Sequence, residues 1–108
     1  MKSYQGLKMT PIIKIDLNNP VFQNDLFSLE KNEQVALIKT LKKIRQLSWH
    51  QLYSDSGLKW EAIISKQSKT GQRIYSFRFS QKYRATAFRE DDFLRLLSLH
   101  VDHDGAYI

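Results

Sequence analysis

Basic residues in the second half of the chain are the side chains best suited to chemistry on a phosphate. From Gly57 to Arg89 there are eight Lys or Arg residues and one acid, Glu61, whereas the stretch from Glu90 to the last residue has five acids and one Arg. A basic block on one face would attract phosphates at long range, and the attraction would weaken as salt rises. The net charge of +6 over 108 residues also favours a polyanionic partner.

Arg78 stands in the clearest pattern of this block. Aromatic residues alternate with polar ones there: Tyr75, Phe77 and Phe79 with Ser76, Arg78 and Ser80. In a strand, this period of two places the aromatic rings on a core face and Arg78 on a wet face. A guanidinium can bind two phosphate oxygens and stabilise the charge that develops during RNA cleavage.

Cleavage of RNA without a metal also needs a base for the 2′-OH proton and an acid for the leaving 5′-oxygen. His100 and His103 are candidates for either role because an unperturbed imidazole titrates near neutrality. Tyr107 is a candidate for proton donation or base stacking, and Glu61 for the general base. Each also has a structural interpretation: histidines hydrogen-bonded to nearby aspartates, a packed tyrosine, and an acid that neutralises its basic neighbours. With Arg78, these four form the candidate catalytic set.

The other basic residues of the block are predicted to bind RNA through its phosphates, since exposed lysines keep their charge. They are Arg84, Lys59, Lys66, Lys69, Arg73 and Lys82. Arg84 has an alternative role, in which it pairs with an acid such as Asp92 and fixes a hairpin. The run from His100 to Asp104 contains metal-ligand types, but its spacing matches no metal signature, so neither a metal nor a cofactor is predicted.

The first half of the chain predicts a short strand followed by helices that position this site. The strand covers Ile12 to Leu17, and the Asn-Pro pair after it starts a helix over Val21 to Leu29. Asn32 then restarts a helix over Glu33 to Leu47, whose apolar stripe is Leu37, Ile38, Leu41 and Ile44. Ser48 to Gln51 has capping-box spacing and predicts one more turn. Trp49 and Trp60 are expected to pack in the core.

The second half predicts an antiparallel meander. A weak strand pattern over Leu58 to Ser65 precedes a polar loop over 66–72, and three stronger strands follow: Arg73 to Ser80, Tyr83 to Arg89 and Phe93 to His100. The sequence therefore predicts an α+β fold, a helical hairpin packed on one face of a mostly antiparallel four-stranded sheet. The prediction is one domain over 1–108, with 1–9 as a loose leader. On the open face, neighbouring strands bring Arg84, Ser98 and His100 beside Arg78.

Composition excludes several classes of protein. The chain has no Cys, so disulfides, thiolate zinc sites and a Cys nucleophile are excluded. Hydrophobic residues make up 42% and charged residues 26%, which is typical of a folded soluble domain. There is no apolar run of roughly 20 residues and no apolar core of a signal peptide. The expectation is a cytoplasmic protein without a membrane partner.

The segment from Ile74 to Arg89, IYSFRFSQKYRATAFR, resembles the "aromatic-x-Arg-x, turn, Tyr-Arg-x-x" hairpin of the RelE/ParE toxin superfamily, and the later LLSLHVDHDGAY resembles its last strand. The resemblance implies a toxin of a toxin-antitoxin system, an endoribonuclease that cuts mRNA on the ribosome, inhibits translation and is silenced by an antitoxin. Arg78 matches the arginine that contacts the scissile phosphate, and Arg84 matches the Tyr-Arg position. Tyr107 is close to the position of a catalytic or base-stacking tyrosine of the family. His100 and His103 stand at positions where other members have basic or imidazole groups.

The tail departs from the family pattern. It carries Asp102 and Asp104 among its histidines and has no C-terminal helix, so the proton-transfer groups remain open. The alternative function is a non-catalytic or gyrase-inhibiting ParE-like toxin, or an inactive nucleic-acid-binding or protein-binding relic of the fold. The occurrence of Arg78 together with a late histidine and Tyr107 favours the enzyme, because a pure binder would not require it.

Overall fold

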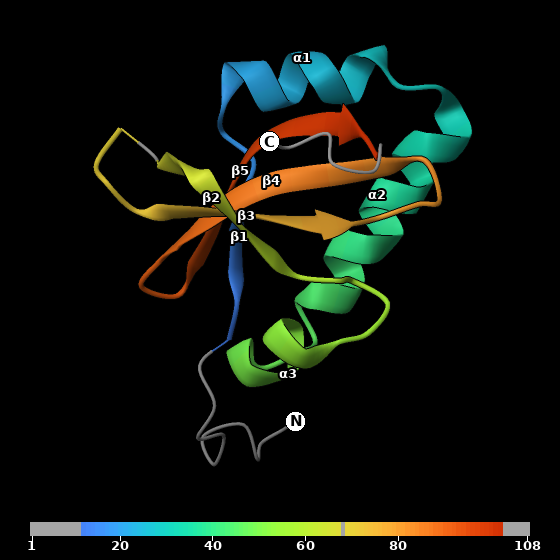
Figure 1. Ribbon diagram of the computed structural model, residues 1–108. Helices are drawn as coiled ribbons and strands as arrows, with labels where there is room; N and C mark the ends of the chain where they lie inside the picture. The colour runs from blue at the N-terminus through green and yellow to red at the C-terminus, as the bar shows by residue number, and fades with distance from the viewer. Residues whose placement is uncertain (1–11, 68, 103–108) are drawn as a thin grey trace.

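The computed structural model describes residues 12–67 and 69–102 (Figure 1). Its elements in chain order are β1 (Lys14–Asp16), α1 (Pro20–Ser28), α2 (Lys31–Ile44), α3 (Trp49–Ser54), β2 (Glu61–Gln67), β3 (Arg73–Arg78), β4 (Tyr83–Glu90) and β5 (Phe93–Val101). The strands form one sheet in the order β1-β5-β4-β3-β2. β1 runs parallel to β5, and every other neighbouring pair is antiparallel.

The α+β class is confirmed, but the predicted four-stranded sheet is wrong. Among the described residues the sheet has five strands and is mixed. The weak pattern before the polar loop forms the additional strand, β2, which pairs with β3 and continues to Gln67. It begins only at Glu61, because Lys59 has a φ of 50° and turns the chain before the strand starts.

The helices begin and end at recognisable signals. The Asn19 side chain accepts hydrogen bonds from the first turn of α1, and the capping box of Ser48 and Gln51 is present at α3. α2 begins at Lys31, so Asn32 does not start it, and Ile38 is 45% exposed instead of joining the core. No helix in the described part of the chain is long and apolar enough to cross a membrane.

The core lies between the helices and one face of the sheet. It joins helical residues to strand residues: Leu37, Leu41, Ile44, Phe77, Ala85 and Leu99. Trp49 is buried, and Trp60 stacks on Tyr75 with ring centroids 4.7 Å apart, so the predicted packing roles of both tryptophans are confirmed.

α1 covers part of the edge of β5. β1 pairs with β5 over Phe93 to Arg95, and no strand from the described residues covers the later half of that edge. There the Asp25 carboxylate of α1 accepts a hydrogen bond from the Leu99 backbone N–H at 2.9 Å. Figure 1 shows α1 beside β5. The end of β5 that carries His100 is therefore held in place by a helix.

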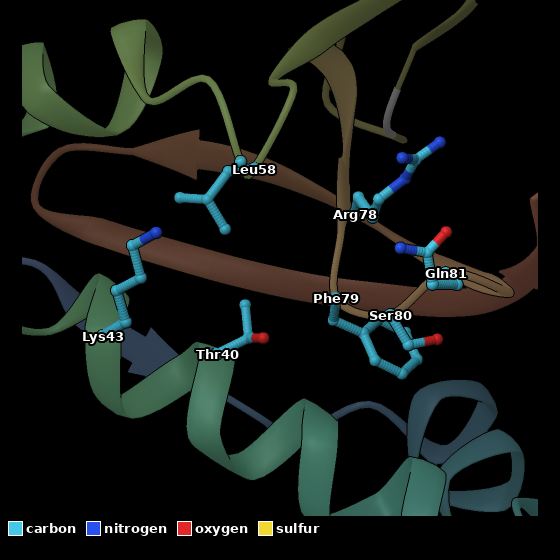
Figure 2. Close-up of a pocket in the computed structure, with 8 residues that line it drawn as sticks. Thr40, Lys43, Leu58, Arg78, Phe79, Ser80 and Gln81 are labelled. Atoms are coloured by element: carbon cyan, nitrogen blue, oxygen red, sulfur yellow. The ribbon is translucent and has the colours of Figure 1, made fainter.

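A groove of about 270 Å³ opens where three segments meet: the end of α2, the loop before β2 and the end of β3 (Figure 2). Arg78, the last residue of β3, forms part of its wall.

Candidate active site

Arg78, Arg84 and His100 lie in one row across three neighbouring strands, and we call these three residues the polar row. The register aligns Arg78 on β3 with Arg84 on β4, and Arg84 with His100 on β5. The adjacent row is aligned in the same way and belongs to the core: Phe77, Ala85 and Leu99. Because successive side chains of a strand point to opposite faces, the polar row lies on the face away from the helices. The predicted juxtaposition of these residues is confirmed.

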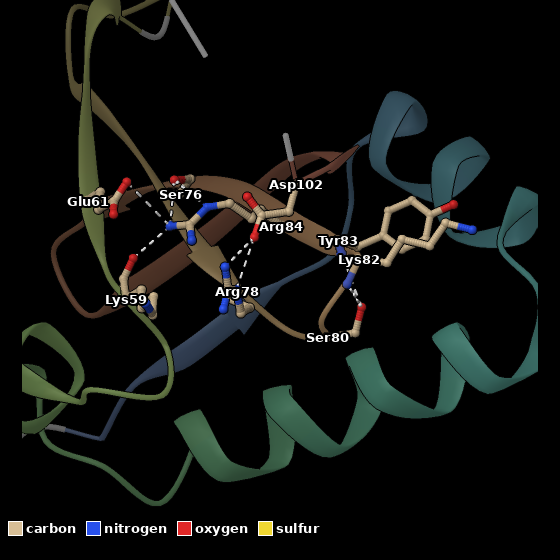
Figure 3. A network of polar contacts seen from close by, with 9 residues as sticks. All are labelled: Lys59, Glu61, Ser76, Arg78, Ser80, Lys82, Tyr83, Arg84 and Asp102. Carbon is tan, nitrogen blue, oxygen red and sulfur yellow. Dashed lines mark hydrogen bonds and ion pairs between the residues drawn. The ribbon is translucent and has the colours of Figure 1, made fainter. Parts of the chain in front are cut away.

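Arg78 is held by a carboxylate. Its Nε and Nη2 donate hydrogen bonds to Oδ2 of Asp102 at 3.0 and 2.6 Å (Figure 3). The backbone N–H of Asp102 in turn donates to the carbonyl of Lys82 at 2.6 Å, which fixes the acid beside the arginine. The side chain of Arg78 is 32% exposed and that of Asp102 12% exposed. A phosphate can therefore reach the guanidinium, but an internal anion already occupies it.

Arg84 lies inside the protein, beneath the segment that leads into β2. Its Nε and Nη2 donate to the Ser76 hydroxyl at 3.1 and 2.9 Å, and Nη2 donates to the Lys59 carbonyl at 2.6 Å. A Glu61 carboxylate oxygen lies 3.8 Å from the same nitrogen. Only 3% of Arg84 is exposed, so the expectation that it binds RNA from the surface does not agree with the structure. The expectation that Ser76 is wet is wrong for the same reason, because Arg84 covers it.

Arg84 is thus a buried contact between the sheet and the Lys59 segment, in addition to the hydrogen bond from the Arg78 backbone N–H to the Leu58 carbonyl. We expect Arg84→Ala to lower the free energy of unfolding by about 3 kcal/mol, because the Ser76 hydroxyl and the Lys59 carbonyl lose a buried donor and a cavity forms. Thermal melting would show a midpoint lower by about 15 °C. Arg73→Ala removes an exposed arginine from the same sheet and should leave the midpoint nearly unchanged. Equal melting of the two variants would contradict the role of Arg84.

His100 is part of a chain of hydroxyl groups that crosses from β5 to β4. Its Nε2 shares a hydrogen bond of 2.7 Å with the Ser98 hydroxyl, which lies 2.5 Å from the Thr86 hydroxyl. Burial lowers the pKa of His100 below the usual 6.5, the charge of Lys66 lowers it further, and Asp25 acts in the opposite direction. The imidazole is therefore mainly neutral at pH 7 and able to accept a proton.

The remaining candidates are Glu61, the other residues predicted to bind RNA and two residues of the tail. Glu61 is 62% exposed and lies beside the buried cation of Arg84, which agrees with a role as its charge partner. The predicted RNA-binding residues other than Arg84 are all exposed: Lys59, Lys66, Lys69, Arg73 and Lys82. His103 and Tyr107 lie outside the described residues, so their roles stay predictions. Over 12–67 and 69–102, no three His, Asp or Glu side chains gather as a metal site would require.

Sequence reasoning placed Ser98 on this face but missed Asp102 as the partner of Arg78. The acids in the tail were interpreted as a departure from the family pattern, as metal-ligand types or as neighbours of the histidines, and not as partners of an arginine. A carboxylate that directly follows one strand can be recognised as the partner of an arginine at the end of a nearby strand, once the register of the sheet is known. Ser98 stands two residues before His100, which places both side chains on one face of a strand.

Comparison with known proteins is informative at the level of structure. A scan against models of protein families finds no match, and a search of curated proteins finds no relative. Among solved structures, the chain is similar to a chain of the archaeal RelE-RelB complex from Pyrococcus horikoshii OT3, with a TM-score of 0.53 and 16% identity over 86% of this chain and 96% of that chain. It is also similar to a copper-bound mutant toxin from Helicobacter pylori, with a TM-score of 0.47 and 20% identity over 88% of this chain and 99% of that chain. At 16% identity, the similarity to the archaeal RelE-RelB chain establishes the architecture of this protein and not its activity. The protein has a RelE-like fold.

Proposed function

We propose that the protein is the toxin of a toxin-antitoxin system and a metal-independent endoribonuclease that cleaves mRNA in the cytoplasm. The observation that carries this proposal is the polar row, which aligns the partly exposed guanidinium of Arg78, the buried guanidinium of Arg84 and the neutral imidazole of His100 on the sheet face opposite the helices. The fold itself is shared by proteins of different activity, so the argument for a nuclease rests on these side chains.

The chemistry that suits the row is attack of an RNA 2′-oxygen on the neighbouring phosphorus. Neutral His100 takes the 2′-OH proton, the 2′-oxygen bonds to phosphorus, and the bond to the 5′-oxygen breaks. The products are a 2′,3′-cyclic phosphate and a 5′-hydroxyl. Arg78 lies two strands away, about 10 Å between backbones, a span that two long side chains and a phosphate can fill. Its charge stabilises the extra negative charge on phosphorus. We assign protonation of the leaving oxygen to His103 or Tyr107.

Arg84 acts in this proposal as a positioning residue. It holds the Lys59 carbonyl and lies beside Glu61, so it fixes the segment that borders the row. As a buried cation, it also raises the positive potential beneath the phosphate, where few water molecules screen it.

Asp102 makes RNA binding a competition. A phosphate that binds Arg78 must displace the carboxylate from the guanidinium or share it. We expect Asp102→Asn to bind single-stranded RNA about 5-fold more tightly at low salt, because the variant removes both the competing charge and its repulsion of phosphate. Asp91→Asn removes the same charge at the exposed β4–β5 turn and is the matched control. Equal affinities of Asp102→Asn and wild type would show that the pair does not obstruct RNA.

An antitoxin is the proposed protein partner. The similar archaeal chain comes from a complex of RelE with RelB, and the exposed lysines of this protein would favour an acidic segment of the partner. Co-expression with the product of the neighbouring gene should restore growth. Failure of both neighbouring genes to do so would count against the toxin role.

The nuclease proposal is tested with purified protein and a labelled mRNA, with and without ribosomes, in the presence of a metal chelator. Cleavage should persist in the chelator and weaken as salt rises, since the basic block attracts the phosphates. The upstream product should end in a 2′,3′-cyclic phosphate, which end-specific enzymes and mass spectrometry identify. Cleavage that needs a divalent metal, or products with a 5′-phosphate, would contradict the mechanism.

A further inference from the structure

The groove beside Arg78 combines an apolar floor with hydrogen-bonding groups at its rim. Leu58 and Phe79 supply apolar surface and are 3% and 6% exposed. Thr40 and Gln81 contribute a hydroxyl and an amide, so the rim offers both donors and acceptors. The volume, about 270 Å³, is of the size of a single nucleoside and far too small for a folded partner.

Lys43 gives the groove a fixed positive charge. In Figure 2 its amine points from α2 toward the opening. The amine lies 3.0 Å from a carboxylate oxygen of Asp55, in a pair that leaves 48% of the lysine side chain exposed. The pKa of Asp55 is lowered: burial opposes the shift, and the hydrogen bonds from Lys43 and from the backbone outweigh it. The pair thus persists at neutral pH and holds the amine at the rim.

Arg78 connects the groove to the polar row. Arg78 lines part of the groove wall, but its guanidinium turns away from the groove and toward Asp102 (Figures 2 and 3). A phosphate on that guanidinium therefore lies within the length of one arginine side chain of the groove wall. In a single strand, the base attached next to a bound phosphate is free to leave the stack and enter a pocket.

We propose that this groove binds one unstacked base of single-stranded RNA, from the nucleotide adjacent to the phosphate that Arg78 holds. The inference rests on the proposed function and adds the means by which substrate is positioned. The base packs against Leu58 and Phe79, and its edge bonds to Thr40 and Gln81. Lys43 attracts the following phosphate.

The test uses fluorescent trinucleotides with 2′-O-methyl riboses, which cannot be cleaved, and measures their binding by anisotropy at low salt. One trinucleotide carries three bases, and three others lack the base at the first, second or third position. Wild type should bind one of the abasic trinucleotides about 10-fold more weakly than the intact one, which is the worth of one well-bound base. Thr40→Trp fills the groove and should bind all four equally. Val35→Trp adds the same side chain at an exposed position of α2 outside the groove and should discriminate like wild type.

Gln81→Ala removes the amide without filling the groove, and it should lower the discrimination while melting like wild type. Equal binding of all four trinucleotides by wild type, or discrimination retained in a folded Thr40→Trp, would overturn the groove as a base site. If wild type still binds RNA in these cases and loses binding in Arg78→Ala, the proposed function stands without the groove. If wild type binds no trinucleotide at all, the inference falls together with RNA binding by this face.

Discussion

His100→Gln is expected to slow RNA cleavage by at least about 100-fold at pH 7, because a positioned general base contributes roughly that much or more. The amide of Gln can keep the hydrogen bond to Ser98 but cannot accept the 2′-OH proton. In the wild type, the neutral fraction of His100 rises with pH through a pKa that lies below 6.5. The cleavage rate of the wild type should therefore rise with pH below 6.5 and be nearly constant around pH 7. The rate of the variant should not rise in this way.

Protein stability must be followed in the same pH range. The unfolded chain binds the His100 proton with the ordinary pKa of 6.5, whereas burial lowers the pKa in the folded protein. The folded state thus loses stability as pH falls from about 6.5 through the lowered pKa, and His100→Gln should not show this loss. His50→Gln, at an exposed position of α3, is the matched control and should cleave like wild type. An unchanged acid limb in a folded His100→Gln would exclude His100 as the base.

Arg78→Ala is expected to slow cleavage by about 100-fold or more, as does the loss of other groups that stabilise a developing charge. Arg78→Lys should recover only part of the rate, since an ammonium cannot bind two phosphate oxygens in one plane. The structure also predicts a small effect on folding. The Asp102 carboxylate loses its partner, so the free energy of unfolding should fall by about 1 kcal/mol.

Arg45→Ala removes an equivalent charge from the exposed C-cap of α2 and controls for a general effect of charge on RNA binding. Kinetics of both variants should be measured above and below the KM for RNA. If Arg78→Ala raises KM and leaves kcat unchanged, Arg78 binds RNA without adding stabilisation that is specific to the transition state. A rate equal to that of wild type would remove the polar row from the mechanism.

Local sequence patterns were sufficient to predict the order of the elements and the faces of β3. The strict alternation around Arg78 predicts both a core of aromatic rings and an outward guanidinium, and the structure has both. Short turns on either side of β4 then bring Arg84 and His100 beside it, because antiparallel strands joined by short turns have little freedom in register. The polar row was predictable for this reason.

The burial of Arg84 and the shape of β5 were not predictable from local patterns. Arg84 is covered only because the chain turns at Lys59 and brings a distant carbonyl across the sheet. In β5 the register shifts opposite Thr86 and Ala87, so that Leu96 and Leu99 both face the core although they stand three residues apart. A bulge of this kind breaks the period of two on which strand predictions rest.

The partner of Arg78 depends on the same geometry. Asp102 follows β5 directly, and whether it reaches the end of β3 depends on how many residues the strand contributes before it. In the proposed function, RNA therefore has to compete with this carboxylate for the guanidinium of Arg78.

The most direct test of the proposed nuclease activity is a map of transcript 5′ ends after brief induction of the wild type and of Arg78→Ala from the same promoter. New 5′ ends inside coding regions, bearing 5′-hydroxyl groups, are expected in cells with the wild type, and they should be nearly absent in cells with an equal amount of folded Arg78→Ala. Growth arrest by the wild type without any new 5′ ends would contradict the nuclease proposal and indicate a toxin that acts without cutting RNA.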